Sequence, residues 1–243
     1  MESRGQDCVE INTPYGERGD AFVRERSHAV VDALRAQHGV KAVVVACNTA
    51  TAAAVDSLRA AHPDVPIVGI EPALKPAAAL SQTGHVGVLA TRGTLTSGRF
   101  QALAARVSPA CDLHLQACDG LAEAIEQAAS DSLDSQEHVG MLIRRYLEPL
   151  GTLGAAAGQI DTLVLGCTHY PLAWPQWASQ VAERARLLDP AAAVAQQLRR
   201  VLSAAGLLRH GSSPAPGLAP LTLVSTGDQA QLRAAARRWA GTQ

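Results

Sequence analysis

The feature that most limits how this chain can fold is a repeated succession of short apolar runs and amphipathic stretches. Short, mainly apolar runs occupy residues 41–46, 65–70, 85–90 and 161–166. Strands buried on both faces have this pattern, and helices between them connect parallel neighbours. The sequence therefore predicts an α/β fold with doubly wound parallel sheets. Weaker strands are expected at 111–117, 185–189 and 221–225, and helices at 19–37, 49–62, 94–107, 121–129, 136–149, 174–185, 191–206 and 228–240.

The composition excludes several classes of protein. The 243 residues are 47% hydrophobic and 18% charged, which favours a buried core over disorder and leaves room for two small domains. A net charge of −1 gives no basic surface for nucleic acid, and no apolar run is long enough for a bilayer. The polar N-terminus and the odd count of five cysteines predict a cytoplasmic protein with free thiols.

Two of the expected strand ends resemble each other. Residues 43–50 (VVVACNTA) and 163–170 (LVLGCTHY) each join an apolar run to a small residue, a cysteine and a polar turn. Sites in parallel sheets lie beyond the carboxyl ends of the strands. A thiol at a helix N-terminus is also expected to have a lowered pKa. The pattern therefore points to Cys47 and Cys167 as a functional pair, one in each half of the chain.

Polar neighbours support chemistry at these turns. His169 is placed to orient the Cys167 thiol or to exchange a proton with it. Hydrogen-bond donors follow each cysteine, and the free N–H groups of a helix start can hold a carboxylate. These donors are Asn48, Thr49 and Thr168.

Two opposed thiols suit the inversion of an α-carbon without a cofactor. One thiolate removes the proton from one face, and the other thiol returns a proton to the opposite face. Three other readings stay open at this point. Cys47 is a small core residue, the cysteines are a redox pair, or Cys47, Cys167 and His169 are zinc ligands. The spacing C-x-x-C, typical of redox and zinc sites, is missing. Cys8, Cys111 and Cys118 are interpreted as structural or incidental.

Several segments together resemble glutamate racemases, within the aspartate/glutamate racemase superfamily. ACNTAT and LGCTHYP are similar to the two catalytic-cysteine signatures of that family, and TPYGERGD is similar to its substrate loop. The matching segments run in family order along nearly the whole chain. They are residues 13–20, 46–51, 69–77, 87–94, 165–171 and 225–228.

The resemblance implies a role for each matching residue. Cys47 and Cys167 would be the two acid/base residues, with His169 assisting Cys167. Thr91 and Thr94 would line the entrance of the pocket. The remaining implied contacts are to the amino-acid substrate, glutamate, and are made by Tyr15, Gly16, Asn48, Thr49, Thr168, His169 and, with a weaker match, Glu126.

The resemblance also implies two pseudo-symmetric domains with the site between them. The first domain would comprise residues 1–72 plus 189–243, and the second residues 73–188. No cofactor and no metal would be needed, the D-glutamate product would supply peptidoglycan synthesis, and the enzyme would be a possible homodimer. The expected partner is therefore a small molecule, with neither nucleic acid nor membrane involved.

The start of the sequence departs from the family pattern. Family members begin with a central strand that ends in Asp-Ser-Gly, whereas this sequence begins MESRGQDCVEIN. Residues 1–12 have little apolar periodicity and are expected to make a poor strand. The first domain is therefore expected to be N-terminally truncated, without the carboxylate beside Cys47. The alternatives that remain are a late start site, an impaired racemase remnant, an aspartate or hydantoin racemase, and a zinc-dependent hydrolase.

Overall fold

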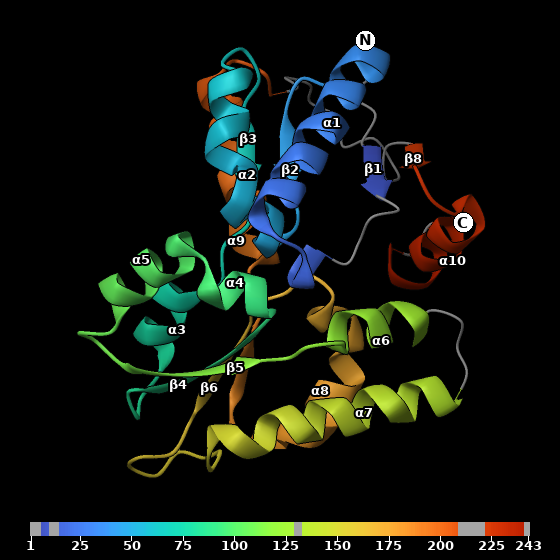
Figure 1. Cartoon of the computed structure of the whole chain (residues 1–243). Helices are drawn as coiled ribbons and strands as arrows, with labels where there is room; N and C mark the ends of the chain where they lie inside the picture. Colours follow the sequence, from blue (N-terminus) through green and yellow to red (C-terminus); the bar gives the residue numbers. More distant parts are fainter. Residues whose placement is uncertain (1–5, 10–14, 129–132, 209–221, 241–243) are drawn as a thin grey trace.

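The computed structural model describes the backbone of residues 6–9, 15–128, 133–208 and 222–240. All paired strands in these ranges are parallel, and the predicted α/β class is confirmed. Figure 1 shows the helices and strands gathered in two lobes. We call residues 74–128 and 133–188 the four-stranded region, and residues 6–9, 15–69, 191–208 and 222–240 the two-sheet region.

The four-stranded region is built on one continuous sheet in the order β5-β4-β6-β7. Its strands are β4 (His85–Ala90), β5 (Asp112–Ala117), β6 (Thr162–Leu165) and β7 (Arg186–Leu188). The sequence predicts each of them to within one residue at either end, β4 and β6 from apolar runs and β5 and β7 as weaker strands. In the register of the sheet, Val88 lies between Leu115 and Val164.

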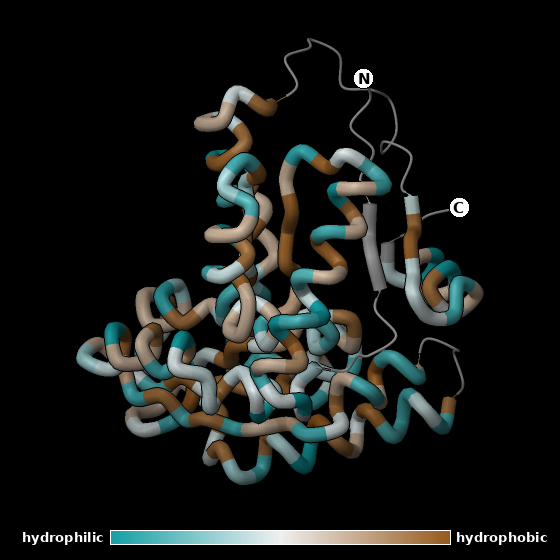
Figure 2. Tube along the Cα trace, turned by 45° about the horizontal axis from the view of Figure 1, so that its top comes forward, coloured by the Kyte–Doolittle hydropathy of each residue, from teal (hydrophilic) through white to brown (hydrophobic). Residues whose placement is uncertain are grey.

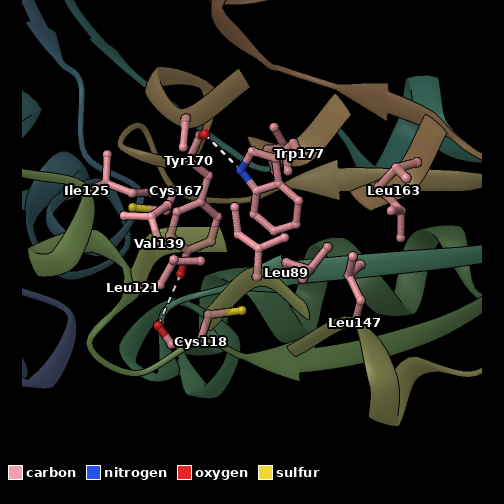
Figure 3. Packing of buried hydrophobic residues seen from close by; sticks show 14 of the residues in the cluster. Leu89, Cys118, Leu121, Ile125, Val139, Leu147, Leu163, Cys167, Tyr170 and Trp177 are labelled. Carbon is pink, nitrogen blue, oxygen red and sulfur yellow. Dashed lines mark hydrogen bonds between the residues drawn. The ribbon is translucent and has the colours of Figure 1, made fainter. Parts of the chain in front are cut away.

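Helices cover both faces of this sheet. Val86, Val88 and Ala90 pack toward α3 (Leu74–Leu80) and α5 (Gly98–Val107), with α4 (Arg92–Thr96) beside them. Leu89, Leu163 and Leu165 pack on the opposite face, as Figure 3 shows for Leu89 and Leu163. The alternation of side chains along each strand therefore supplies both cores. The second face is covered by α6 (Leu121–Gln127), α7 (Leu133–Leu147), η4 (Tyr170–Ala173) and α8 (Trp174–Val181).

The two-sheet region contains two separate pairs of strands. β2 (Val43–Val45) pairs with β3 (Ile67–Gly69), and β1 (Gln6–Val9) pairs with β8 (Thr222–Ser225). No ladder joins the two pairs within the described residues. Figure 2 shows brown and teal stretches alternating along the helices. These helices are α1 (Asp20–His38), α2 (Asn48–Ala61), α9 (Ala191–Ala204) and α10 (Gln229–Ala240).

Two local predictions are wrong. Residues 6–9 form a strand, because a parallel ladder joins backbone groups and does not require an apolar run. The helix expected at 94–107 is divided at Ser97. The backbone of Ser97 is extended, and its hydroxyl accepts a hydrogen bond from the Phe100 N–H, so α5 starts there as a separate helix.

No helix in the described ranges is long and apolar enough to cross a membrane. Further short 3-10 helices lie between these elements, at Tyr15–Glu17 (η1), Glu148–Leu150 (η3) and Ala182–Arg184 (η5).

Candidate active site

Cys47 is the N-cap residue of α2. The chain leaves β2 at Val45, Cys47 has extended backbone angles, and its Sγ accepts a hydrogen bond from the Ala50 N–H at 3.4 Å. The thiol is half-buried, at the start of a 14-residue helix. The prediction that this cysteine opens a helix is therefore confirmed, and its sulfur lies among the free N–H groups of the first turn.

The pKa of Cys47 is raised, not lowered as the helix N-terminus led us to expect. Burial raises it most, while the N–H groups of Ala50 and Thr49 and the Thr49 hydroxyl act in the opposite direction. Desolvation disfavours the thiolate more than these donors favour it. The free thiol is consequently protonated, and a thiolate at this position needs the donors around it.

Cys167 has the corresponding place in the four-stranded region. β6 ends at Leu165, and the Cys167 side chain is 8% exposed in the core cluster of that sheet (Figure 3). Burial raises the pKa of Cys167 to about 12, although the backbone N–H groups of His169 and Tyr170 act to lower it. A negative charge on Cys47 would raise it further, so the two sulfurs are close enough to influence each other's ionisation.

His169 and Glu126 extend the site from Cys167. The His169 Nδ1 lies 3.9 Å from the Cys167 Sγ, and its Nε2 lies 3.7 Å from the Glu126 Oε2 in α6. Burial lowers the pKa of His169, and the Glu126 carboxylate opposes that shift. A neutral imidazole beside a thiol is suited to exchange a proton with it. The structure thus brings the weakest of the sequence-based candidates, Glu126, next to His169.

Asn48 is buried without hydrogen-bond partners. Its side chain is 5% exposed, and neither Nδ2 nor Oδ1 has a partner among the described residues. It lines a small hollow together with Glu71, Thr94, Ser97 and Arg99. An unpaired buried amide is destabilising by ~1–3 kcal/mol, so this group is suited to meet a polar ligand.

Tyr15, Gly16 and Thr168 complete the set of predicted residues. Tyr15 is buried in η1 against Ala50, with Cys47 packed at the edge of the same cluster. Gly16 lies against Thr91, so closely that a Cβ on Gly16 would come within 2.8 Å of the Thr91 Cβ. Thr168 is half-buried between Cys167 and His169. The loop from the two-sheet region therefore packs against the start of α4.

Cys118 lies nearer to the site than the sequence had indicated. It follows the end of β5, lies in the same buried cluster as Cys167, and lines a hollow with Gly16 and Thr91 (Figure 3). The Tyr170 hydroxyl donates to its carbonyl oxygen at 3.4 Å. A signal was present, because Cys118 directly follows the strand expected at 111–117. Its burial is that of a core residue, as is that of Cys111. The side chain of Cys8 lies outside the described residues.

The zinc reading finds no support in the described part of the chain. No group of three or more His, Cys, Asp or Glu side chains there is placed to hold a metal ion. The four cysteines whose side chains are described are free thiols. What these thiols can do is acid/base or nucleophilic chemistry in a partly desolvated site between two sheets.

Comparisons with known proteins agree with this geometry. The family model described as Asp/Glu/Hydantoin racemase matches residues 9–198. A glutamate racemase of Pseudomonas syringae pv. tomato is 47% identical over 84% of this chain and 70% of its own length. One from Pseudomonas aeruginosa is also 47% identical, over 84% of this chain and 74% of its own.

Solved structures give the same result. An Escherichia coli glutamate racemase, in complex with L-glutamate and the activator UDP-MurNAc-Ala, superposes with a TM-score of 0.77 at 30% identity. The match covers 95% of this chain and 82% of that one. A glutamate racemase isoform of Bacillus anthracis gives a TM-score of 0.77 at 31% identity, covering 97% and 84% of the two chains.

Proposed function

This chain belongs to the Asp/Glu/Hydantoin racemase family, and we propose that it interconverts L- and D-glutamate with Cys47 and Cys167 as the two acid/base groups. It is an amino-acid racemase, and hence an isomerase. Glutamate is the substrate named for its curated relatives and the ligand in the Escherichia coli structure.

The single observation that carries the proposal is the matched placement of the two thiols. Each follows the carboxyl end of a parallel strand, one in each region, and receives backbone N–H groups from its own turn. The charge of Cys47 also affects the pKa of Cys167. This is the arrangement that removal of a proton from one face of a carbon and its return to the other face requires.

The reaction follows from the protonation of the two sulfurs. With one enantiomer bound, the thiolate of one cysteine takes the proton from the α-carbon, and the thiol of the other cysteine donates a proton to the opposite face. One proton leaves and one arrives, so no cofactor is consumed. The cysteines end with their protonation states exchanged, and the reverse reaction starts from that state. His169, whose Nδ1 lies 3.9 Å from the Cys167 Sγ, would exchange a proton with Cys167 between turnovers.

Substrate binding is assigned to the donors around the thiols. The N–H groups at the start of α2 and the unpartnered amide of Asn48 suit a carboxylate. Gly16 and Tyr15 would close the site from η1, and Thr168 would contact the ligand beside Cys167. Thr49 and Glu126 would complete the binding set, Glu126 through His169.

The wider setting is part of the proposal. The site would lie between domains formed by residues 1–72 plus 189–243 and residues 73–188, and the β1–β8 pairing supports assigning both ends of the chain to one domain. A reaction that depends on two free thiols needs a reducing compartment, which favours the cytosol. We propose that the D-glutamate serves peptidoglycan synthesis, and that the enzyme is a homodimer.

Racemisation of L-glutamate, followed by circular dichroism in D₂O, tests the function. We expect inversion accompanied by exchange of the α-hydrogen with solvent, and a loss of ~10²–10⁴-fold or more in Cys167→Ala in both directions. Cys111→Ala is the matched control, because Cys111 is an equally buried thiol packed with α5, away from Cys167. Turnover retained in Cys167→Ala, or inversion without deuterium uptake, would reject the two-thiol scheme. Inversion of aspartate or of a hydantoin, without inversion of glutamate, would show that glutamate is not the substrate.

A further inference from the structure

Three threonine hydroxyls meet where the two regions join. Thr49 lies in the first turn of α2, Thr91 caps α4, and Thr94 lies in α4. The Thr49 Oγ1 is 3.0 Å from the Thr91 Oγ1 and 3.3 Å from the Thr94 Oγ1, and the latter two are 2.9 Å apart. Thr49 and Thr94 are 4% and 1% exposed, and Thr91 is half-buried.

One hydrogen bond of this cluster has a fixed direction. The Thr94 N–H can only donate, and it donates to the Thr91 Oγ1 at 3.3 Å. The Thr91 hydroxyl is then able to donate to the Thr49 oxygen, which leaves the Thr49 proton available to Cys47, the cap of the same helix two residues earlier. The Thr49 hydroxyl acts to lower the pKa of Cys47. Hydrogen bonds in such a chain polarise one another, so each donor strengthens the next.

Close backbone packing holds the two sides of this cluster together. A Cβ on Gly93 would lie 2.9 Å from the Gly16 carbonyl oxygen and 3.3 Å from the Thr49 Cγ2. Only a glycine at position 93 allows α4 to approach η1 and α2 this closely. The hydroxyls of Thr91 and Thr94 are therefore fixed relative to α2 by contacts other than their own hydrogen bonds.

We propose that Thr91 and Thr94, in the four-stranded region, are positioning residues that direct the Thr49 proton onto Cys47 in the two-sheet region. The contact between α4 and α2 would thereby set the reactivity of Cys47 directly, and would reach Cys167 only through the charge of Cys47. Cys167 takes its donors from its own turn, the N–H groups of His169 and Tyr170. The meaning of this control for catalysis rests on the proposed function, whereas the control itself does not.

The proposal predicts an effect on one cysteine, with the other as an internal reference. The full chain is treated with iodoacetamide at one fixed pH, and the alkylation rate of each cysteine is followed by peptide mass spectrometry. We expect Thr91→Val to slow alkylation of Cys47 about tenfold, the factor for one pKa unit of thiolate fraction, without slowing alkylation of Cys167. Thr91→Ser, which restores the hydroxyl and the cap, should return the Cys47 rate to that of the wild type.

A second comparison separates the hydroxyl chain from a simple packing role. Thr49→Val removes the last donor, so it should slow alkylation of Cys47 as much as Thr91→Val does. In the double variant, alkylation of Cys47 should be no slower than in Thr49→Val alone. Additive effects would overturn the proposal. Equal slowing of alkylation at Cys47 and Cys167 would also overturn it, as would failure of Thr91→Ser to restore the alkylation rate of Cys47.

Two buried thiols report on unfolding in the same experiment. If Thr91→Val loosens the fold through loss of the α4 cap, Cys111 and Cys118 will react faster. In that case Thr94→Val decides, because it keeps the Thr91 cap. In this variant, slower alkylation of Cys47 with unchanged alkylation of Cys111 and Cys118 supports the proposal. An unchanged alkylation rate of Cys47 rejects it. A chain that shows the alkylation pattern but does not racemise glutamate would reject the proposed function alone.

Discussion

The two regions of the molecule hold their cysteines in different ways. Cys167 stands at the end of a strand that has a neighbour on each side and helices on both faces. Cys47 stands at the end of β2, which pairs on one side with β3 and leaves Val44 38% exposed. The α9 helix, which packs beside β3, has no fully buried residue among those described. One thiol is thus positioned by a continuous core, and the other relies on local contacts from α2 and from the opposite region.

This difference shows that the same sequence pattern can give two different environments for a cysteine thiol. Both cysteines follow an apolar run and open a polar turn, and burial raises the pKa of both. Only Cys47 has a side-chain hydroxyl bond among the donors that lower its pKa, and that hydroxyl is bonded to the other region. The comparison can be sharpened by perturbing each region in turn.

The largest expected effect on stability lies in the continuous sheet. Leu163→Ala removes a fully buried side chain from the core shared by β6 and the α7–α8 face. We expect a loss of ~2–5 kcal/mol in the free energy of unfolding, from lost burial and from the cavity left behind. Urea denaturation followed by far-ultraviolet circular dichroism measures it. A loss below ~1 kcal/mol would mean that this sheet does not govern the stability of the fold.

An intermediate effect is expected at the start of β6. The Asp161 carboxylate accepts bonds from the Ser81 hydroxyl at 2.7 Å and from the N–H groups of Gln82 and Thr83 at 2.6 and 3.0 Å. Burial acts to raise the pKa of Asp161, but these donors outweigh it and lower the pKa. We expect Asp161→Asn to destabilise the protein by ~1 kcal/mol at neutral pH, allowing for its partial exposure.

The pH dependence of that effect has a definite sign. A carboxyl group with a lowered pKa in the folded state stabilises above its unfolded pKa, and the contribution is lost as the pH falls through the folded pKa. Thermal melts at pH 7 and near pH 3 should therefore show the difference between wild type and Asp161→Asn shrinking in acid. A difference that is constant with pH would assign the effect to hydrogen-bond geometry and not to charge.

The smallest effect is expected in the two-sheet region. Val44→Ala truncates an exposed side chain in the middle of β2, so it should change stability by only ~0.5 kcal/mol. The same urea titration provides the measurement, with Leu163→Ala as the buried counterpart. A loss comparable to that of Leu163→Ala would show that Val44 is covered in solution, and the contrast between the regions would then disappear.

The sequence was informative where structure is local. Apolar runs predicted β4 and β6, the weaker patterns at 111–117 and 185–189 predicted β5 and β7, and the turns after β2 and β6 located Cys47 and Cys167. The pairing of residues 6–9 with 222–225 could not be predicted, because it joins opposite ends of the chain through backbone groups alone. The meeting of Thr49 with Thr91 and Thr94 depends on the packing of α2 against α4, which neither segment encodes by itself. Burial also reversed the expected direction of the Cys47 pKa shift.

The unpartnered amide of Asn48 links folding to occupancy of the site. Its two buried polar atoms have no hydrogen-bond partner among the described residues, so a ligand that bonds them would stabilise the fold. A ligand that bonds this amide binds the folded chain and not the unfolded one, and it raises the melting temperature by mass action. The melting temperature of the protein, measured with different small molecules added, should therefore indicate which of them bind at this site.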